Sequence, residues 1–248
     1  MLNGSSTNAL LNGKKTTCVA CQSRCDSIFS GMTADQLEIF EANHVVNRYP
    51  RGQAIFYEGN VPIALYCLAS GKVKLSKMGE HGKQQILRVA KSSDVLGYRS
   101  LLLNKPYQAT AEALEDATVC VIPRVAFFEW LNTSISFNRK LLDRMAKDLG
   151  DEEQRLLEMV DTPAPQRLAR TLLTLSRKFG KTIGKSVELE VPLTREEIGE
   201  IIGTTLETTI RMLSALKKRG VVSLGRRRIV IQDLARLARI AENGETGD

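Results

Sequence analysis

The chain has 248 residues, of which 43% are hydrophobic and 25% are charged, and its formal net charge is +7. This balance predicts a globular protein of one large or two modest domains, and the basic excess favours a polyanionic partner. No apolar run approaches the length of a membrane span, and the polar N-terminus lacks a signal peptide's apolar stretch, so we expect a cytoplasmic protein without membrane association.

Residues 1–30 form a polar tail that ends in a cysteine cluster. Cys18, Cys21 and Cys25 are arranged with C-x2-C-x3-C spacing. Thiolates this close together suit an iron–sulfur cluster or zinc, although three of them leave such a site one ligand short. The odd total of five cysteines, in a chain without a secretion signal, argues against a disulfide framework. A redox dithiol or inert cysteines are the remaining alternatives.

Residues 31–125 are predicted to be mostly β-strands. Short runs rich in β-branched and aromatic residues, such as 54–57, 73–75 and 119–122, are separated by glycine or proline turn signals. Regular turn signals of this kind predict a small sandwich or barrel, which is a common scaffold for sensing ligands. Cys67 lies in one of these runs, and we interpret it as an ordinary buried strand residue.

Residues 126–160 are predicted to form one long helix with a heptad-like apolar seam. The helix is expected to end before Pro163 and Pro165. Side-by-side packing of two such helices would make a homodimer, and packing of the seam within one chain is the alternative. Glu152 breaks the apolar pattern, so it either turns to solvent or keeps the dimer marginal, because like charges repel. The expected dimer residues are Leu142, Met145, Leu149, Glu152, Leu156 and Met159.

Residues 161–248 are predicted to be helical, with a short strand pair near Val222 and Ile229. Thr194 and Glu197 have the spacing of a capping box at the start of a helix. Gly203 supplies a tight turn, and Thr204 or Thr205 can cap a second helix. Two short helices joined in this way make a helix-turn-helix.

The second of these helices has one apolar face and one face that we expect to be exposed. In this motif the exposed face enters the major groove, where arginine can bind guanine and glutamate can accept from cytosine. A basic hairpin tip follows and is placed to meet phosphates. The expected DNA contacts are Glu207, Ile210, Arg211, Ser214, Lys217, Arg226, Arg227 and Arg228.

Segments across the chain resemble one family. Two segments resemble the helix-turn-helix of Crp/Fnr regulators: TREEIG, which starts at Thr194, and ETTIR, which starts at Glu207. Three further segments resemble that family's β-roll: GQAIFYEG, SGKVKL and DVLG. The resemblance covers about residues 30–235. It implies an α+β fold with an N-terminal β-roll, a jelly roll like that of cyclic-nucleotide-binding domains, followed by a long dimerisation helix and a C-terminal winged helix-turn-helix. It further implies a homodimer that binds near-palindromic double-stranded DNA. RNA polymerase is a further partner that such a regulator can contact.

The resemblance also bears on the ligand of the β-roll. The cyclic-AMP-binding members carry a Gly-Glu pair for the ribose and an Arg-Ser/Thr pair for the phosphate. Here the matching positions are Gly97-Tyr98 and Gln108-Ala109. A buried phosphate without a cation or good donors is costly to desolvate. We therefore expect no tight binding of cyclic nucleotides.

Cys120 resembles the distant fourth cluster ligand of FNR-type oxygen sensors. This likeness implies an oxygen-labile [4Fe–4S] cluster held by Cys18, Cys21, Cys25 and Cys120, which controls dimerisation. The third N-terminal cysteine comes sooner than in FNR proteins, and Ile210 stands where they usually carry serine. Zinc held by the same four cysteines is the structural alternative.

Two other classes of function compete with a DNA-binding regulator. One is a ligand-binding module that acts through protein partners, and the basic wing and the two-faced helix argue against it. The other is an enzyme. The chain has only two histidines, and we find no paired-carboxylate, nucleophile-elbow or phosphate-loop motif in it. Both observations argue against catalysis.

Overall fold

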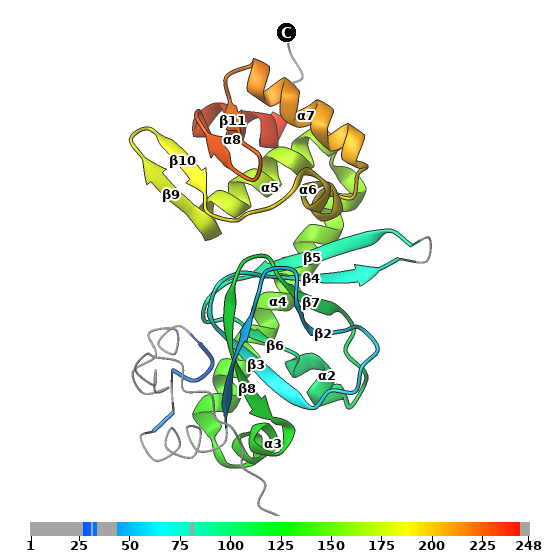
Figure 1. The fold of residues 1–248 in the computed structure, drawn as a ribbon, viewed down its shortest axis with the longest axis vertical. Coiled ribbons are helices and arrows are strands. Elements are labelled where there is room, and N and C mark those ends of the chain that lie inside the picture. Colours follow the sequence, from blue (N-terminus) through cyan, green and yellow to red (C-terminus); the bar gives the residue numbers. More distant parts are fainter. Residues whose placement is uncertain (1–26, 31, 34–43, 80–81, 244–248) are drawn as a thin grey trace, which may run out of the picture.

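The computed structural model describes residues 27–30, 32–33, 44–79 and 82–243. A β-rich body and a second body of helices with a small sheet are joined by one long helix (Figure 1). Among the described helices, none is both long and apolar enough to cross a membrane.

The β-rich body consists of two four-stranded antiparallel sheets, ordered β1-β8-β3-β6 and β2-β7-β4-β5. Buried side chains from both sheets, such as Leu68 from the first and Val73 from the second, fill the space between the layers. The strands are β1 Val45–Tyr49, β2 Ala54–Phe56, β3 Ala64–Ser70, β4 Val73–Met78, β5 Gln84–Ala90, β6 Val95–Leu96, β7 Thr110–Ala113 and β8 Ala117–Pro123, with helix α2 Tyr98–Leu103 after β6.

The turn between β3 and β4 requires glycine. Gly71 has φ +87°, and a Cβ there would lie 2.7 Å from the Cα of Ala117. Only glycine avoids both the strained backbone and this clash. The turn signal in the sequence therefore marks a place where two segments of backbone approach closely.

The single helix predicted over 126–160 is wrong in one respect, because the structure has two helices there. Helix α3 spans Arg124–Thr133, and α4 spans Ile135–Asp161. Ser134 between them is extended, and its side chain accepts a 3.3 Å hydrogen bond from the backbone N–H of Phe137. Serine competes with the helical backbone in this way and favours a helix start. Helix α4 then runs the length of the β-roll to the C-terminal body (Figure 1).

The C-terminal body contains more sheet than predicted. Besides the expected strand pair it has a β9–β10 hairpin, which makes a sheet ordered β11-β12-β10-β9. Strand β9 is exposed along its whole length, so it lacks the alternation of apolar and polar residues that would reveal it. The elements are α5 Ala164–Phe179, β9 Gly180–Ile183, β10 Ser186–Leu189, α6 Arg195–Ile202, α7 Leu206–Lys218, β11 Val222–Leu224, β12 Ile229–Ile231 and α8 Leu234–Asn243.

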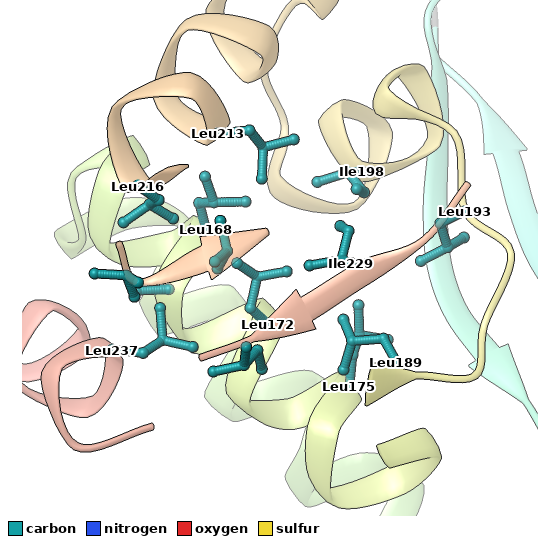
Figure 2. Close-up of a cluster of buried hydrophobic side chains, with 14 of the residues drawn as sticks. Leu168, Leu172, Leu175, Leu189, Leu193, Ile198, Leu213, Leu216, Ile229 and Leu237 are labelled. Atoms are coloured by element: carbon teal, nitrogen blue, oxygen red, sulfur yellow. The ribbon is translucent and has the colours of Figure 1, made fainter. Parts of the chain in front are cut away.

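This body has its own hydrophobic core. Leu168 and Leu172 of α5 point toward Ile198 of α6, Leu213 of α7 and Ile229 of β12 (Figure 2). All five side chains are at most 5% exposed. Helices α6 and α7 are therefore fixed on a packed base, which leaves their outer faces for contacts with other molecules.

Candidate nucleic-acid interface and sensor residues

Both helices of the predicted helix-turn-helix begin where capping residues place them. At the start of α6, the Thr194 hydroxyl accepts from the backbone N–H of Glu197 at 3.1 Å, and the Glu197 carboxylate accepts from the backbone N–H of Thr194 at 2.8 Å. Gly203 ends α6 with φ +70°. Of the two candidate caps for the second helix, Thr205 is the one used, since its hydroxyl accepts from the N–H of Thr208 at 3.2 Å.

Helix α7 crosses α6 closely on its apolar face. Thr209 and Leu213 are 0% and 1% exposed, and the Thr209 hydroxyl donates to the carbonyl of Thr205 at 2.9 Å. A Cβ on Gly199 of α6 would lie 2.8 Å from the Thr209 hydroxyl, so glycine is needed at the crossing. The two helices consequently form one rigid unit.

The opposite face of α7 is exposed, as predicted. Glu207, Arg211 and Ser214 are all exposed. Ile210 is 47% exposed. We call Glu207, Ile210 and Arg211 the reading face. The predicted contact Lys217 lies at the exposed end of the same helix.

The wing is the β11–β12 hairpin, closed by a 2.7 Å hydrogen bond from the N–H of Gly225 to the carbonyl of Arg228. Arg226 and Arg227 at its tip are exposed. Arg228 is also exposed but forms an ion pair with Glu188 of β10, with its Nη2 2.8 Å from the carboxylate. The cations that project from the tip are therefore Arg226 and Arg227, while Arg228 also braces the hairpin against the sheet.

Arg195 is a residue whose role the sequence did not reveal. Its guanidinium donates to the carbonyl of Gly225 at 2.7 Å and so ties the wing to the first turn of α6. The sequence places Arg195 directly after the capping residue Thr194 and indicates no further role for it. Positive charge is concentrated in this body, since residues 166–240 hold sixteen of the 35 Lys and Arg residues but seven of the 28 Asp and Glu residues.

The predicted dimer seam on α4 is largely uncovered. Leu142, Leu149 and Leu156, spaced seven residues apart, are 62–66% exposed. Met145 and Glu152 are exposed as well. An apolar stripe of this kind on a charged helix is typical of a surface that packs against another helix.

Met159, the last predicted member of the seam, leans elsewhere. It is only partly exposed, and its sulfur lies 3.4 Å from where a Cβ on Gly203 would be. Met159 thus contacts the turn of the helix-turn-helix. Leu157 and Val160 are 58% and 75% exposed and extend the apolar surface of α4 at this end.

Of the four predicted metal ligands, only Cys120 lies in the described part of the chain, because Cys18, Cys21 and Cys25 fall outside it. Across the described ranges, no three His, Cys, Asp or Glu side chains are grouped to hold a metal ion. Cys120 is 6% exposed and pairs in register with Cys67 of β3.

The surroundings of Cys120 suit the implied cluster. Cys120 shares a buried cluster with Ile28 and Phe29, which follow Cys25 by three and four residues. Phe29 packs against Trp130 of α3 and Phe137 of α4, with ring centroids 5.8 and 5.9 Å apart. The chain just beyond the cysteine cluster is therefore anchored in the layer that contains Cys120.

A cleft of about 860 Å³ opens between the β-roll and the helices and reaches the positions that bind cyclic nucleotides in the family. Tyr98 is 2% exposed and donates its hydroxyl to the carboxylate of Asp148 on α4. Asp148 is paired with Arg88 at 3.1 Å and with Arg144 at 2.8 Å, and Arg144 also pairs with Asp94. Burial and the Asp148 hydrogen bond raise the pKa of Tyr98 to about 12. The cations nearest Tyr98 are thus already neutralised by carboxylates of the protein.

Comparisons with known proteins agree with this architecture. Residues 46–134 match a cyclic nucleotide-binding domain, and residues 166–240 match a Crp-like helix-turn-helix domain. The CRP-like cAMP-activated global transcriptional regulator of Mycobacterium tuberculosis is 30% identical over 193 residues, which cover 78% of this chain and 86% of that protein. The fumarate and nitrate reduction regulatory protein of Yersinia pestis is 26% identical over 85% of each chain.

Among solved structures, FixK2 from Bradyrhizobium japonicum superposes with a TM-score of 0.71 at 27% sequence identity. The match covers 79% of this chain and 96% of that chain. The expected order of a β-rich, cyclic-nucleotide-binding-like domain, a helical connection and a C-terminal helix-turn-helix is therefore confirmed.

Proposed function

Since this chain belongs to the Crp/Fnr family of transcription regulators, we propose that it binds near-palindromic DNA as a homodimer whose formation depends on an oxygen-labile iron–sulfur cluster. The observation that carries DNA binding is the exposed reading face on a rigid, doubly capped helix pair. Arginine can form two hydrogen bonds to guanine, glutamate can accept from cytosine, and an exposed isoleucine can contact a thymine methyl group. The proposed base contacts are Glu207, Ile210, Arg211 and Ser214.

The cations around the reading face suit phosphates. Lys217 lies at the end of α7, and Arg226 and Arg227 project from the wing. Phosphate contacts of this type fix the register of a protein on the duplex and supply affinity without sequence preference. Arg228 adds charge at the base of the wing, reduced by its ion pair with Glu188.

Dimerisation through α4 follows from its uncovered stripe. Three leucines at heptad spacing cost free energy while they face water, and pairing of two α4 helices would bury them. A dimer also presents two reading faces about one DNA turn apart, as two half-sites require. Glu152 lies within this stripe and would meet its counterpart, so we propose that the dimer is marginal.

The proposed signal enters at Cys120. When bound, a [4Fe–4S] cluster would be held by Cys18, Cys21, Cys25 and Cys120 and would supply an oxygen-sensitive link between the N-terminal segment and β8. Cys120 shares its buried cluster with Phe137 and Leu141 at the start of α4. Packing changes around Cys120 thereby reach the dimer helix. The second candidate is a regulator with structural zinc held by the same four cysteines, or with another small-molecule effector.

The β-roll cleft is proposed not to bind cyclic nucleotides tightly. Tyr98 fills the carboxylate position of the ribose site, and Asp148 and Asp94 already pair with the nearby Arg88 and Arg144. Freeing these cations for a phosphate would leave partly buried carboxylates unpaired. Calorimetry with cyclic AMP tests this, and sub-micromolar affinity would overturn it.

The experiment for DNA binding uses anaerobically purified full-length protein and a duplex selected from a random library. Arg211→Ala should weaken binding about tenfold or more, because a bidentate arginine–guanine contact is worth roughly 1–3 kcal/mol. Arg239→Ala on α8 is the matched control, since it removes the same charge from an exposed site of the same body. Equal affinities of the two variants would contradict the assignment of the reading face.

A further inference from the structure

Helix α6 is held at both ends by side chains from outside its own domain. The β4–β5 hairpin lies directly against it (Figure 1). We propose that Lys74 of the β-roll and Arg155 of α4 are positioning residues for DNA recognition, which act by fixing α6 and, through it, the reading face of α7. This inference rests on the proposed DNA binding and adds residues that do not touch DNA.

The first contact is at the N-terminal end of α6. Lys74 is buried, and its Nζ lies 3.0 Å from the carboxylate of Glu197 and 3.2 Å from that of Glu112 on β7. The Glu197 carboxylate also completes the capping box at Thr194. One carboxylate therefore both starts α6 and joins it to the sensor domain.

Charge favours this arrangement at neutral pH. Burial acts to lower the pKa of Lys74, but the hydrogen bonds and charges of Glu197 and Glu112 outweigh it and raise the pKa. Burial acts to raise the pKa of Glu197, but the backbone of Thr194 and the ammonium of Lys74 lower it. Both groups stay charged, so the contact persists across the physiological range.

The second contact is at the C-terminal end of α6, where carbonyls lack partners within the helix. The carbonyl of Ile201 accepts from Arg155 at 3.1 Å and from Gln85 of β5 at 3.3 Å. The same Arg155 guanidinium donates to the carbonyl of Ile86 on β5. A cation is favoured at this end by the helix dipole. Arg155 thus bonds the dimer helix, the sensor sheet and α6 together.

These contacts orient the reading face and leave it uncovered. Glu207, Ile210 and Arg211 are exposed and take no part in the contacts just described. Helix α7 crosses α6 rigidly at Gly199 and Thr209, so any rotation of α6 turns the reading face with it. An ion pair this far removed from water adds little net stability compared with apolar packing. The role that we assign to it is therefore to specify geometry.

A dimer makes this geometry measurable. Two reading faces must match half-sites at one fixed separation, so a loosened α6 should relax the spacing requirement. Binding to a single half-site needs no such match. Spacing preference therefore separates a positioning role from a general loss of DNA contacts.

The test uses full-length protein and three duplexes: a palindrome selected by the wild type, the same palindrome with its half-sites one base pair further apart, and a single half-site. In Lys74→Met, affinity for the selected palindrome should fall about tenfold while half-site affinity is unchanged. The preference for the selected spacing should shrink accordingly. Lys74→Arg keeps the charge and should restore it, and Glu112→Gln, which leaves the Glu197 contact intact, should resemble the wild type.

Arg155→Met tests the other end independently, which matters because Lys74→Met leaves Glu197 in a partly buried site. Wild-type spacing preference in both variants would overturn the inference, as would tighter palindrome binding, which would make the contacts inhibitory. Failure of the wild type to select any duplex would instead reject DNA binding itself.

Discussion

At the scale of single residues, Glu200 on α6 is the least satisfied carboxylate of the described chain. Its Oε2 is buried without a hydrogen-bond partner among the described residues. Burial raises the pKa of Glu200, and the negative charges of Glu196, Glu197 and Glu112 add to this effect against the opposing charge of Lys74. The charged form is therefore disfavoured in the folded protein relative to the unfolded chain.

Glu200→Gln should accordingly stabilise the protein at neutral pH. A carboxyl with a raised folded-state pKa costs stability above that pKa, and the cost disappears as the pH falls to the ordinary value of 4.5. Thermal unfolding should show a higher midpoint for the variant at pH 7.5 and equal midpoints near pH 4. A difference between variant and wild type that is the same at both pH values would contradict this explanation.

Cys120 and Cys67 allow a matched test of the cluster ligands. They pair in register on neighbouring strands, share one buried cluster and are 6% and 7% exposed. Cys120→Ala should abolish the four irons per chain expected after anaerobic reconstitution, whereas Cys67→Ala should retain them, because only Cys120 is the proposed ligand. Iron and sulfide analysis with visible absorption gives the result. A colourless protein with one zinc would favour the alternative metal.

At the scale of elements, the sequence predicts those whose ends carry specific side-chain chemistry. The capping box at Thr194 and the cap at Thr205 both appear where the spacing places them. The break at Ser134 was missed because a serine inside a strong helical pattern resembles a tolerated polar residue. Strand β9 was missed because its pairing with β10 depends on a partner rather than on its own pattern.

The candidate site also contains some residues that local sequence predicts and others whose roles depend on distant contacts. The reading face follows from helical periodicity alone, since a period of 3.6 residues separates Thr209 and Leu213 from Glu207 and Arg211. The roles of Arg195, Lys74 and Arg155 depend on contacts 30, 123 and 46 residues away along the chain. No local pattern encodes such contacts, so they emerge only from the folded structure.

The dimer helix yields a prediction at this scale. Glu152→Leu should strengthen dimerisation about tenfold or more, because it removes a repulsive pair and adds a buried leucine, worth roughly 1.5–3 kcal/mol when fully covered. Asp143→Leu, which also replaces an exposed acid on α4 but one position past Leu142 of the seam, should leave dimerisation unchanged. Sedimentation over a dilution series measures both, and equal effects would argue that α4 does not pair through this seam.

At the scale of the whole molecule, packing connects Cys120, the proposed sensor residue, with the helices that carry the proposed reading face. The buried cluster around Cys120 includes Phe137 of α4, and Arg155 near the other end of α4 contacts α6. A ligand at Cys120 can shift the population of dimers only by as much as it favours one state over the other. A marginal dimer is therefore the condition for a useful response, since a strongly stabilised dimer would form whether or not the ligand is present.

The Glu152→Leu substitution should protect the dimer against exposure to air. Exposure of the wild type to air should convert dimers to monomers and lower affinity for the selected palindrome about tenfold or more, because cluster loss withdraws the bias toward pairing. Glu152→Leu should stay dimeric and keep its affinity under the same exposure, although its cluster absorption is lost equally. Sedimentation, absorption and DNA binding on one air-exposed sample distinguish the outcomes. If the variant loses DNA affinity while it remains dimeric, oxygen acts on the orientation of the reading face and not on α4 pairing. The marginal pairing of α4 would then not control DNA binding.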